Sequence, residues 1–386
     1  MKPTLLALCL LLFTQCILAQ VKKPVTPVKP KSVADSVRAL RDSTWKAQTK
    51  NKQKTEGLFT FYQDTVSGSA YMYIRKDQLN KEFIYQSFSM GGPAMLFLNQ
   101  NMIRETWVFK MRKVFGRMEF LRCNTNYYYD STNAVSKAKD VDVSDAVFHT
   151  GAVRAEDSLG YLINADSLFI SEKLDMVKPI MPPGIAPATF FNLGNLVTDK
   201  SGYEKIRSFP QNADVVVSLA YDNPAPMNGG DRSITDARYV RVKMQHSFIK
   251  MPENNYLPRF DDPRVGYFTT ESDNLTSLKP TRFHDLIHRW NLEKKDPTAK
   301  LSEPIEPITW WIENTTPVEL RQLFLEAGAR WNEAFEYAGF KNAVVMKMMP
   351  DTASWDPADI RYNVIRYVAS DLGFAIGPSF VNPRTG

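Results

Sequence analysis

The sequence predicts an α+β fold, with a β-rich region first and a smaller α/β region after it. Short runs of alternating apolar residues fill most of residues 55–300, and turn-forming stretches such as PIMPPGIAP and NPAPMNGGD separate them. After residue 300, apolar residues recur at intervals of three and four, which is the period of an amphipathic helix. This change of period marks the boundary between the two regions.

The composition is that of an ordinary globular protein. The chain has 386 residues, of which 44% are hydrophobic and 23% charged, and its net charge is +6. Part of this positive charge lies in one short proline-rich stretch, which argues against a nucleic-acid-binding face. Cys9 and Cys16 lie in the extreme N-terminus, so Cys123 alone can form neither a disulfide framework nor a cysteine-based zinc site.

Residues 1–19 have the features of a secretory signal peptide. Lys2 precedes an uncharged, leucine-rich run from Thr4 to Ala19, and the bond between Ala19 and Gln20 is a suitable cleavage site. The run is shorter than the ~20 residues of a transmembrane helix. We therefore expect an exported protein without a transmembrane span, in the periplasm, on the outer-membrane surface or outside the cell. Lipidation of Cys16 stays open.

The exported part is expected to begin with a linker and then to become β-rich. Residues 20–54 form a basic, proline-rich linker and a polar segment, residues 55–95 a small β module, and residues 96–300 a larger β-rich middle domain. FTFYQD with SAYMYIRK predicts one hairpin, and ETWVFKMRKV with MEFLRCN predicts a second. The later runs expected to be strands are YLINADSLFIS, DVVVSLAYD and RYVRVKMQHSFIK.

Residues 301–386 predict the order strand, helix, strand, strand. The first strand is EPITWWIEN, in which Ile308, Trp310 and Ile312 alternate. The segment 316–319 has the form of a capping box, and the apolar positions of residues 320–338 predict a helix that ends at Gly339. NAVVMKMM and RYNVIRYVAS are the two later strands.

One pair of histidines is a candidate metal site. His284 and His288, in FHDLIHRWNLEKKD, would bind one metal from the same face if this segment were helical, as in HExxH. Three features count against zinc here: Asp285 stands where HExxH has Glu, no third ligand follows, and Arg289 adds positive charge. We therefore predict no metal bound by this pair.

The remaining chemistry of the sequence is sparse. His246 shares the parity of the apolar residues around it and is expected in the core, whereas His149 stands alone in a polar stretch. Asp356 and Asp359 lack the alternating oxygen ligands of a calcium loop and are expected to lie in solvated turns or to cap a helix or strand. No Ser or Cys lies in a nucleophile-elbow sequence. The residues alone predict no catalytic constellation.

A resemblance to a known family adds a function. The stretch that contains HRWNLEKKDP, TWWIENTTPVELRQLFLEAGARWNEAFEYAGFKNAVVMKMM, RYNVIRYVAS and GFAIGPSFVNPRTG resembles a family of large exported zinc-dependent metalloproteases of Bacteroidetes-type bacteria. KTEGLFTFYQ and DPRVGYF are similar to landmarks of the domains of unknown function that precede the protease domain in that family. The resemblance covers the chain from about residue 35 to its end.

This resemblance implies a metzincin-like catalytic domain, in which a strand, a long helix, two strands and an edge strand precede a zinc helix carrying HExxHxxGxxH. Residues 301–386 match the pieces before that helix, so the zinc ligands and the general base are expected beyond Gly386. The chain would then be the N-terminal part of a zinc metallopeptidase, inactive as given, whose complete form acts on a peptide or protein substrate. The alternative is a secreted β-rich binding or pro-domain-like protein without catalysis.

The resemblance also implies a place for the substrate. In this family type a sheet edge beside the zinc holds the peptide as an added antiparallel strand. The residues at the corresponding position here are Gly373, Phe374, Ala375, Ile376 and Gly377. Glycines allow close approach of another backbone, and the following proline is tolerated where a ladder is incomplete. An irregular loop is the alternative for this segment. Zinc is the cofactor expected in the complete protein, and none is expected in this chain.

Overall fold

The computed structural model describes residues 33–139, 143–179, 184, 186, 188–370, 373–377 and 379–386. The chain divides into two compact units, residues 1–44 and 45–386. The predicted signal peptide and most of the proline-rich linker lie outside the described residues. The boundary between the two units falls within helix α2 (Val33–Thr49). The described part of the first unit is therefore the beginning of this helix.

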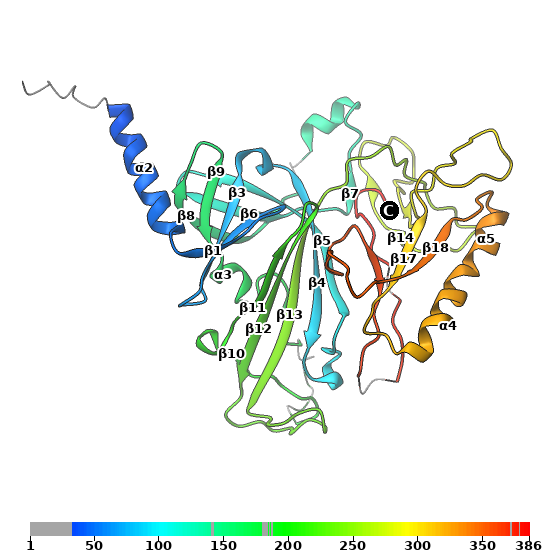
Figure 1. The fold of residues 1–386 in the computed structure, drawn as a ribbon. Coiled ribbons are helices and arrows are strands. Elements are labelled where there is room, and N and C mark those ends of the chain that lie inside the picture. Colours follow the sequence, from blue (N-terminus) through cyan, green and yellow to red (C-terminus); the bar gives the residue numbers. More distant parts are fainter. Residues whose placement is uncertain are drawn as a thin grey trace, which may run out of the picture. The chain divides into compact units, whose positions relative to one another are not determined.

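The second unit contains one large sheet of twelve strands, all in antiparallel pairs (Figure 1). The strands are β1 (Lys52–Thr55), β2 (Thr60–Asp64), β3 (Ala70–Arg75), β4 (Glu82–Gly91), β5 (Met102–Val114), β6 (Arg117–Arg122), β8 (Ala146–Glu156), β9 (Gly160–Asn164), β10 (Asn195–Leu196), β11 (Gly202–Ser208), β12 (Asn212–Asp222) and β13 (Tyr239–Lys250). Their order is β1-β2-β3-β9-β8-β6-β5-β4-β13-β12-β10, and β11 also pairs with β12.

Both predicted hairpins are present, as β2–β3 and β5–β6. Strands from the predicted module, residues 55–95, and from the predicted middle domain, residues 96–300, belong to this one sheet. Alternation is clear in β3, for example, where every second side chain is buried. The β-rich α+β class is thus confirmed.

A single apolar cluster fills one face of the large sheet. Its most buried large side chains come from strands far apart in the sequence, such as Phe61, Phe109, Phe120 and Phe248. Between β9 and β10 the chain enters this cluster as helix α3 (Asp166–Phe169) and the residues after it. We call residues 165–178 the plug segment. The predicted strand YLINADSLFIS is therefore correct only as far as residue 164, because the Asp166 carboxylate accepts hydrogen bonds from the Ser69 hydroxyl and the Ala70 amide and turns the chain inward.

The two ends of the large sheet approach each other near Gly57. The Leu58 amide donates to the Phe209 carbonyl at 2.7 Å, and the Ser208 hydroxyl donates to the Phe59 carbonyl at 2.6 Å. A Cβ on Gly57 would lie 2.4 Å from the Ser208 carbonyl carbon, so only glycine fits at this crossing. The sheet is in this way nearly closed.

A second, parallel sheet lies in the C-terminal part. It has the order β18-β17-β19 and joins β17 (Ile308–Ile312), β18 (Val344–Met348) and β19 (Asn363–Ile365). Helices α4 (Val318–Ala329) and α5 (Trp331–Tyr337) connect β17 to β18 (Figure 1). We call residues 308–365 the αβ region. Its order of strand, helix, strand and strand is the one predicted from the sequence.

Two details of the predicted helix are wrong. It is divided at Arg330 into α4 and α5, and no capping box forms at its start. Pro317 is the N-cap residue, and the Thr316 hydroxyl is buried without a hydrogen-bond partner. The Thr316 side chain is thus buried and does not cap the helix.

The other described elements are short. Two small pairs join β14 (Thr269–Thr270) with β16 (Leu286–Ile287), and β15 (Asp273–Asn274) with β7 (Tyr127–Tyr128). The single-turn 3-10 helices are Lys76–Gln78, Ala94–Leu96, Ala134–Ala138 and Thr198–Lys200. No helix among the described residues is long and apolar enough to cross a membrane.

Candidate functional site

The candidate metal pair does not lie on a helix. His284 and His288 flank strand β16, and in an extended chain residues four apart are about 13 Å from each other. The His284 ring stacks on Tyr128 with the ring centroids 4.0 Å apart, and His288 Nε2 lies 3.0 Å from the Thr270 hydroxyl. In the described part of the chain, no group of three or more His, Cys, Asp or Glu could hold a metal ion. The residues that the structure describes therefore do not fit zinc.

The other two histidines are buried in the large sheet. His246 lies in the core, as predicted, with Nδ1 at 2.8 Å from the Tyr85 hydroxyl. His149 Nδ1 lies 3.4 Å from the Lys173 ammonium. Burial lowers the pKa of each imidazole to about 4, and at His149 the nearby lysine adds to the effect. Both rings are therefore neutral at physiological pH, and the Nε2 atom of each has no hydrogen-bond partner.

Buried polar groups attach the plug segment to the strands. The Asp175 carboxylate accepts a bond from the Ser87 hydroxyl at 2.7 Å and two bonds from the Arg104 guanidinium at 2.8 and 2.9 Å. Glu172 accepts a bond from the Tyr221 hydroxyl at 3.0 Å. Ser87 donates to Asp175 and not to a histidine, so this network lacks the Ser–His arrangement that activates a nucleophile. Its geometry supports a structural role.

The predicted substrate-binding residues Gly373, Phe374, Ala375, Ile376 and Gly377 form no strand in the structure. All five are exposed and follow β19, the edge strand of the parallel sheet. The binding of a substrate as an added strand along this segment stays a prediction.

The αβ region is packed on both sides of its sheet. Gly328 of α4 faces Met346 of β18 so closely that a Cβ on the glycine would lie 2.3 Å from the methionine sulfur. On the other side of the sheet, the Trp311 ring meets Trp355 edge to face at a centroid distance of 5.2 Å. Several apolar side chains on the outer side of the helices remain exposed, including Leu323 (61%), Trp331 (64%) and Tyr337 (97%).

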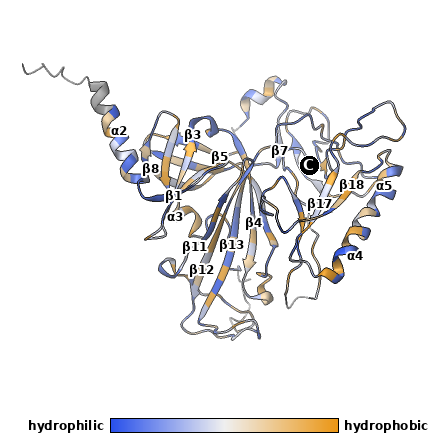
Figure 2. Cartoon of the chain, viewed as in Figure 1, coloured by the Kyte–Doolittle hydropathy of each residue, from blue (hydrophilic) through white to orange (hydrophobic). Residues whose placement is uncertain are grey.

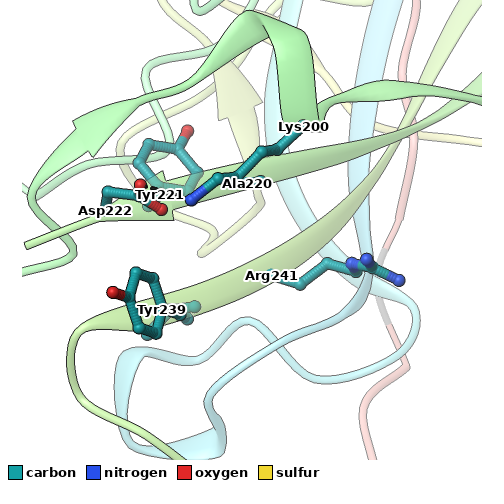
Figure 3. A pocket seen from close by; sticks show the side chains of 7 residues that line it. Lys200, Ala220, Tyr221, Asp222, Tyr239 and Arg241 are labelled. Carbon is teal, nitrogen blue, oxygen red and sulfur yellow. Dashed lines mark hydrogen bonds and ion pairs between the residues drawn. The ribbon is translucent and has the colours of Figure 1, made fainter.

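A groove of about 390 Å³ lies where β12 and β13 approach their connecting loop (Figure 3). It is lined by Lys200, Ala220, Tyr221, Asp222, Tyr239, Val240 and Arg241. The Lys200 ammonium lies 2.5 Å from the Asp222 carboxylate and 4.9 Å from the centre of the Tyr239 ring. Figure 3 shows Tyr239 and Arg241 on the strand next to Asp222. The groove combines an aromatic ring with charged groups of both signs, of which Lys200 and Asp222 are paired with each other.

Two buried polar residues near the contact between the large sheet and the αβ region were not identified from the sequence. Asn212, at the start of β12, binds a loop of the αβ region, and Asp214 is buried in the apolar run DVVVSLAYD. An aspartate directly before the apolar run VVVSLAY is the signal that could have identified this position, because a buried carboxylate requires partners. Asp356 and Asp359 accept bonds from backbone amides of their own loop, and both are paired with arginines, but Asp359 is buried and not solvated as expected.

Comparison with known proteins identifies one family. Residues 101–295, about half of the chain, match the family model described as Domain of unknown function (DUF5117). The matched range lies within the predicted middle domain, residues 96–300. No curated protein and no solved structure matches the chain.

Proposed function

The chain belongs to the DUF5117 family, and we propose that it is the N-terminal part of an exported zinc-dependent metallopeptidase. In this proposal, the large sheet is a non-catalytic domain and the αβ region is the first half of the catalytic domain. Because the described residues do not fit zinc, the ligands and the general base belong to a later part of the protein. The contribution of residues 1–386 is then structural support and an edge for the substrate.

The observation that carries the proposal is the topology of the αβ region. Strand β17, helices α4 and α5, and strands β18 and β19 occur in the order of the metzincin-like domain that the sequence resembles. The three parallel strands have the order β18-β17-β19, so β19 is one edge of the sheet. The exposed residues 373–377 follow β19 in the sequence.

The gene tests the proposal before any assay. The reading frame after codon 386 should encode HExxH within about 50 codons, and the complete protein should cleave peptides in a reaction that a metal chelator stops. A reading frame that ends at codon 386, or a complete protein without chelator-sensitive cleavage, would contradict the proposal.

The role of the segment 373–377 has a separate test in the complete protein. Ala375→Pro or Ile376→Pro removes one amide hydrogen from the edge and should raise KM for a peptide substrate by about tenfold, the effect of losing ~1.4 kcal/mol of binding. Zinc content should stay unchanged. Thr352→Pro is the control, because it introduces a proline into an exposed loop of the αβ region and breaks no helix. Equal KM values in all variants would place the substrate elsewhere.

Export belongs to the same proposal. The mature protein should begin at Gln20, which N-terminal sequencing of the secreted material measures. A mature chain that keeps residues 1–19 would contradict the predicted signal peptide.

A second candidate function, binding without catalysis, is favoured by the groove beside Tyr239. A reading frame that ends at codon 386 would support this candidate. Its direct test is Tyr239→Ala, which removes the exposed ring from the groove and should abolish binding of any ligand that protects the protein against heat.

A further inference from the structure

A loop of the αβ region is held in a fixed shape by its own residues. Residues 355–362, which precede β19, are here called the wedge loop. The rings of Trp355 and Tyr362 stack in parallel with their centroids 4.0 Å apart, and Trp355 also contacts Trp311 of β17. The Asp359 carboxylate, which is buried, accepts bonds from the Arg361 guanidinium. The loop is thus attached to its own sheet through the contact of Trp355 with Trp311.

One side chain of the large sheet binds the backbone of this loop. Asn212, at the start of β12, is only 2% exposed. Its Nδ2 group donates to the Ala358 carbonyl at 2.9 Å, and its Oδ1 atom accepts from the Ile360 amide at 3.0 Å. The same Nδ2 group also donates to Asp214 Oδ1 at 3.0 Å. The side-chain amide of Asn212 therefore bonds to two backbone groups of the wedge loop and to the buried Asp214 carboxylate.

Charged groups surround this contact. Asp356 of the wedge loop lies 3.3 Å from the Arg207 guanidinium and 3.6 Å from the Lys205 ammonium, both on β11. Arg207 also donates to Gln245 of β13 at 2.9 Å and lies 3.8 Å from Asp214, which is 1% exposed. The Arg207 Nε group is buried without a hydrogen-bond partner, so the contact leaves one donor unsatisfied.

The contacts of Asn212, Arg207 and Lys205 with the wedge loop are all polar. Among the described strands, no ladder joins the parallel sheet to the large sheet. Hydrogen bonds of this kind exchange with water when a contact opens, so their net contribution is modest, whereas a mutated partner leaves buried groups unsatisfied. Such a polar contact favours one position of the αβ region against the large sheet. It can also open without unfolding of the αβ region or of the large sheet.

We propose that Asn212, Arg207 and Asp214 form a polar latch that positions the αβ region through the wedge loop, and that opening the latch releases the αβ region while the large sheet stays folded. Asn212 is a positioning residue in this proposal, which holds whether or not the protein is a peptidase. Local opening of this kind is how proteins move one part against another.

Asn212→Asp tests the latch without changing the shape of the side chain. The substitution replaces the Nδ2 donor by an oxygen that faces the Ala358 carbonyl and the Asp214 carboxylate, so attraction becomes repulsion. In hydrogen–deuterium exchange at pH 7.5, peptides that contain residues 355–365 should exchange at least about tenfold faster than in the wild type, because two bonds of the latch are lost. Peptides from β5 and β13 should keep their protection.

Asn254→Asp is the matched control. Asn254 is exposed, and its Oδ1 atom accepts from the Tyr256 amide, a bond that aspartate retains. Asp356→Asn is a milder second variant: the amide oxygen still accepts from the Ala358 amide, while the attraction to Arg207 and Lys205 is lost. It should accelerate exchange in the wedge loop by about threefold, in line with the smaller effect of a partly exposed ion pair.

The outcomes separate clearly. Faster exchange confined to the wedge loop and the αβ region supports the latch. Unchanged exchange there in both Asn212→Asp and Asp356→Asn overturns it. Equal acceleration in the wedge loop and in the large sheet also overturns it, because the two parts would then open as one unit. If Asn212→Asp does not fold, the comparison of Asp356→Asn with the wild type decides.

Discussion

The large sheet and the αβ region use apolar residues in different ways. In the large sheet, aromatic and aliphatic side chains from distant strands meet in one cluster, and many of them are fully buried. In the αβ region, α4 and α5 contain no fully buried residue, and Figure 2 shows apolar positions on α4. The same kind of residue therefore stabilises one part strongly and the other weakly. Sequence periodicity alone reports the presence of an apolar face and not whether that face is covered.

The largest expected effect separates the two regions directly. Phe109→Ala removes a ring from the core of the large sheet and should lower the free energy of unfolding by about 3–5 kcal/mol. Leu323→Ala, on the exposed side of α4, should change it by less than about 0.5 kcal/mol. Urea unfolding followed by circular dichroism measures both. Similar losses in the two variants would show that the outer side of α4 is covered in solution.

A smaller effect is expected for the polar attachment of the plug segment. Asp175→Ala leaves Ser87 and the Arg104 guanidinium without their buried partner and should destabilise the protein by about 3 kcal/mol. Asp262→Ala is the control, because it breaks an exposed pair with Arg264 and should have an effect below about 0.5 kcal/mol. A stability of Asp175→Ala near that of the wild type would mean that the plug segment is held by apolar contacts alone.

The buried His246 predicts a pH dependence of the large sheet. Its pKa is lowered from 6.5 to about 4, so the folded state disfavours the proton. The stabilisation is therefore fully present above the unfolded pKa and is lost as the pH falls from about 6.5 toward 4. Between pH 7 and pH 5, the wild type should lose about 2 kcal/mol more than His246→Gln. Parallel pH profiles of the two proteins would contradict the buried, neutral state of this histidine.

The smallest expected effect concerns metal. After dialysis the chain should retain well under one zinc ion per molecule, because His284 and His288 lie on an extended segment. Elemental analysis measures the content, and His284→Ala should leave it unchanged. One tightly held zinc that disappears in this variant would restore the pair as a metal site.

The sequence predicts the strands better than it predicts how they are combined. In β5 and β13, apolar residues recur at every second position. This pattern is contained in a short stretch of sequence, so both strands can be predicted without knowledge of their partners. The plug segment depends on Asp166, whose carboxylate binds Ser69 and Tyr203, and no local pattern contains these contacts. For the same reason the hairpins are predicted correctly, while the joining of all twelve strands in one sheet is not.

The candidate site shows the same limit. The spacing of His284 and His288 fits a metal pair only on a helix, but the residues between them pair with Thr269 and Thr270 as a strand. Tertiary pairing thus decides what a spacing means. The latch residue Asn212 is not recognisable from its neighbours, because its partners, Ala358 and Ile360, lie almost 150 residues further along the chain.

The contact near Gly57 has a consequence for the rate of folding. It joins Phe59 to Ser208, which are 149 residues apart, and so closes a very long loop. The chain must lose the conformational entropy of that loop before the contact contributes any stability, which slows folding. We expect this junction to form late, after the hairpins. Ser208→Ala should then speed unfolding while leaving the refolding rate nearly unchanged.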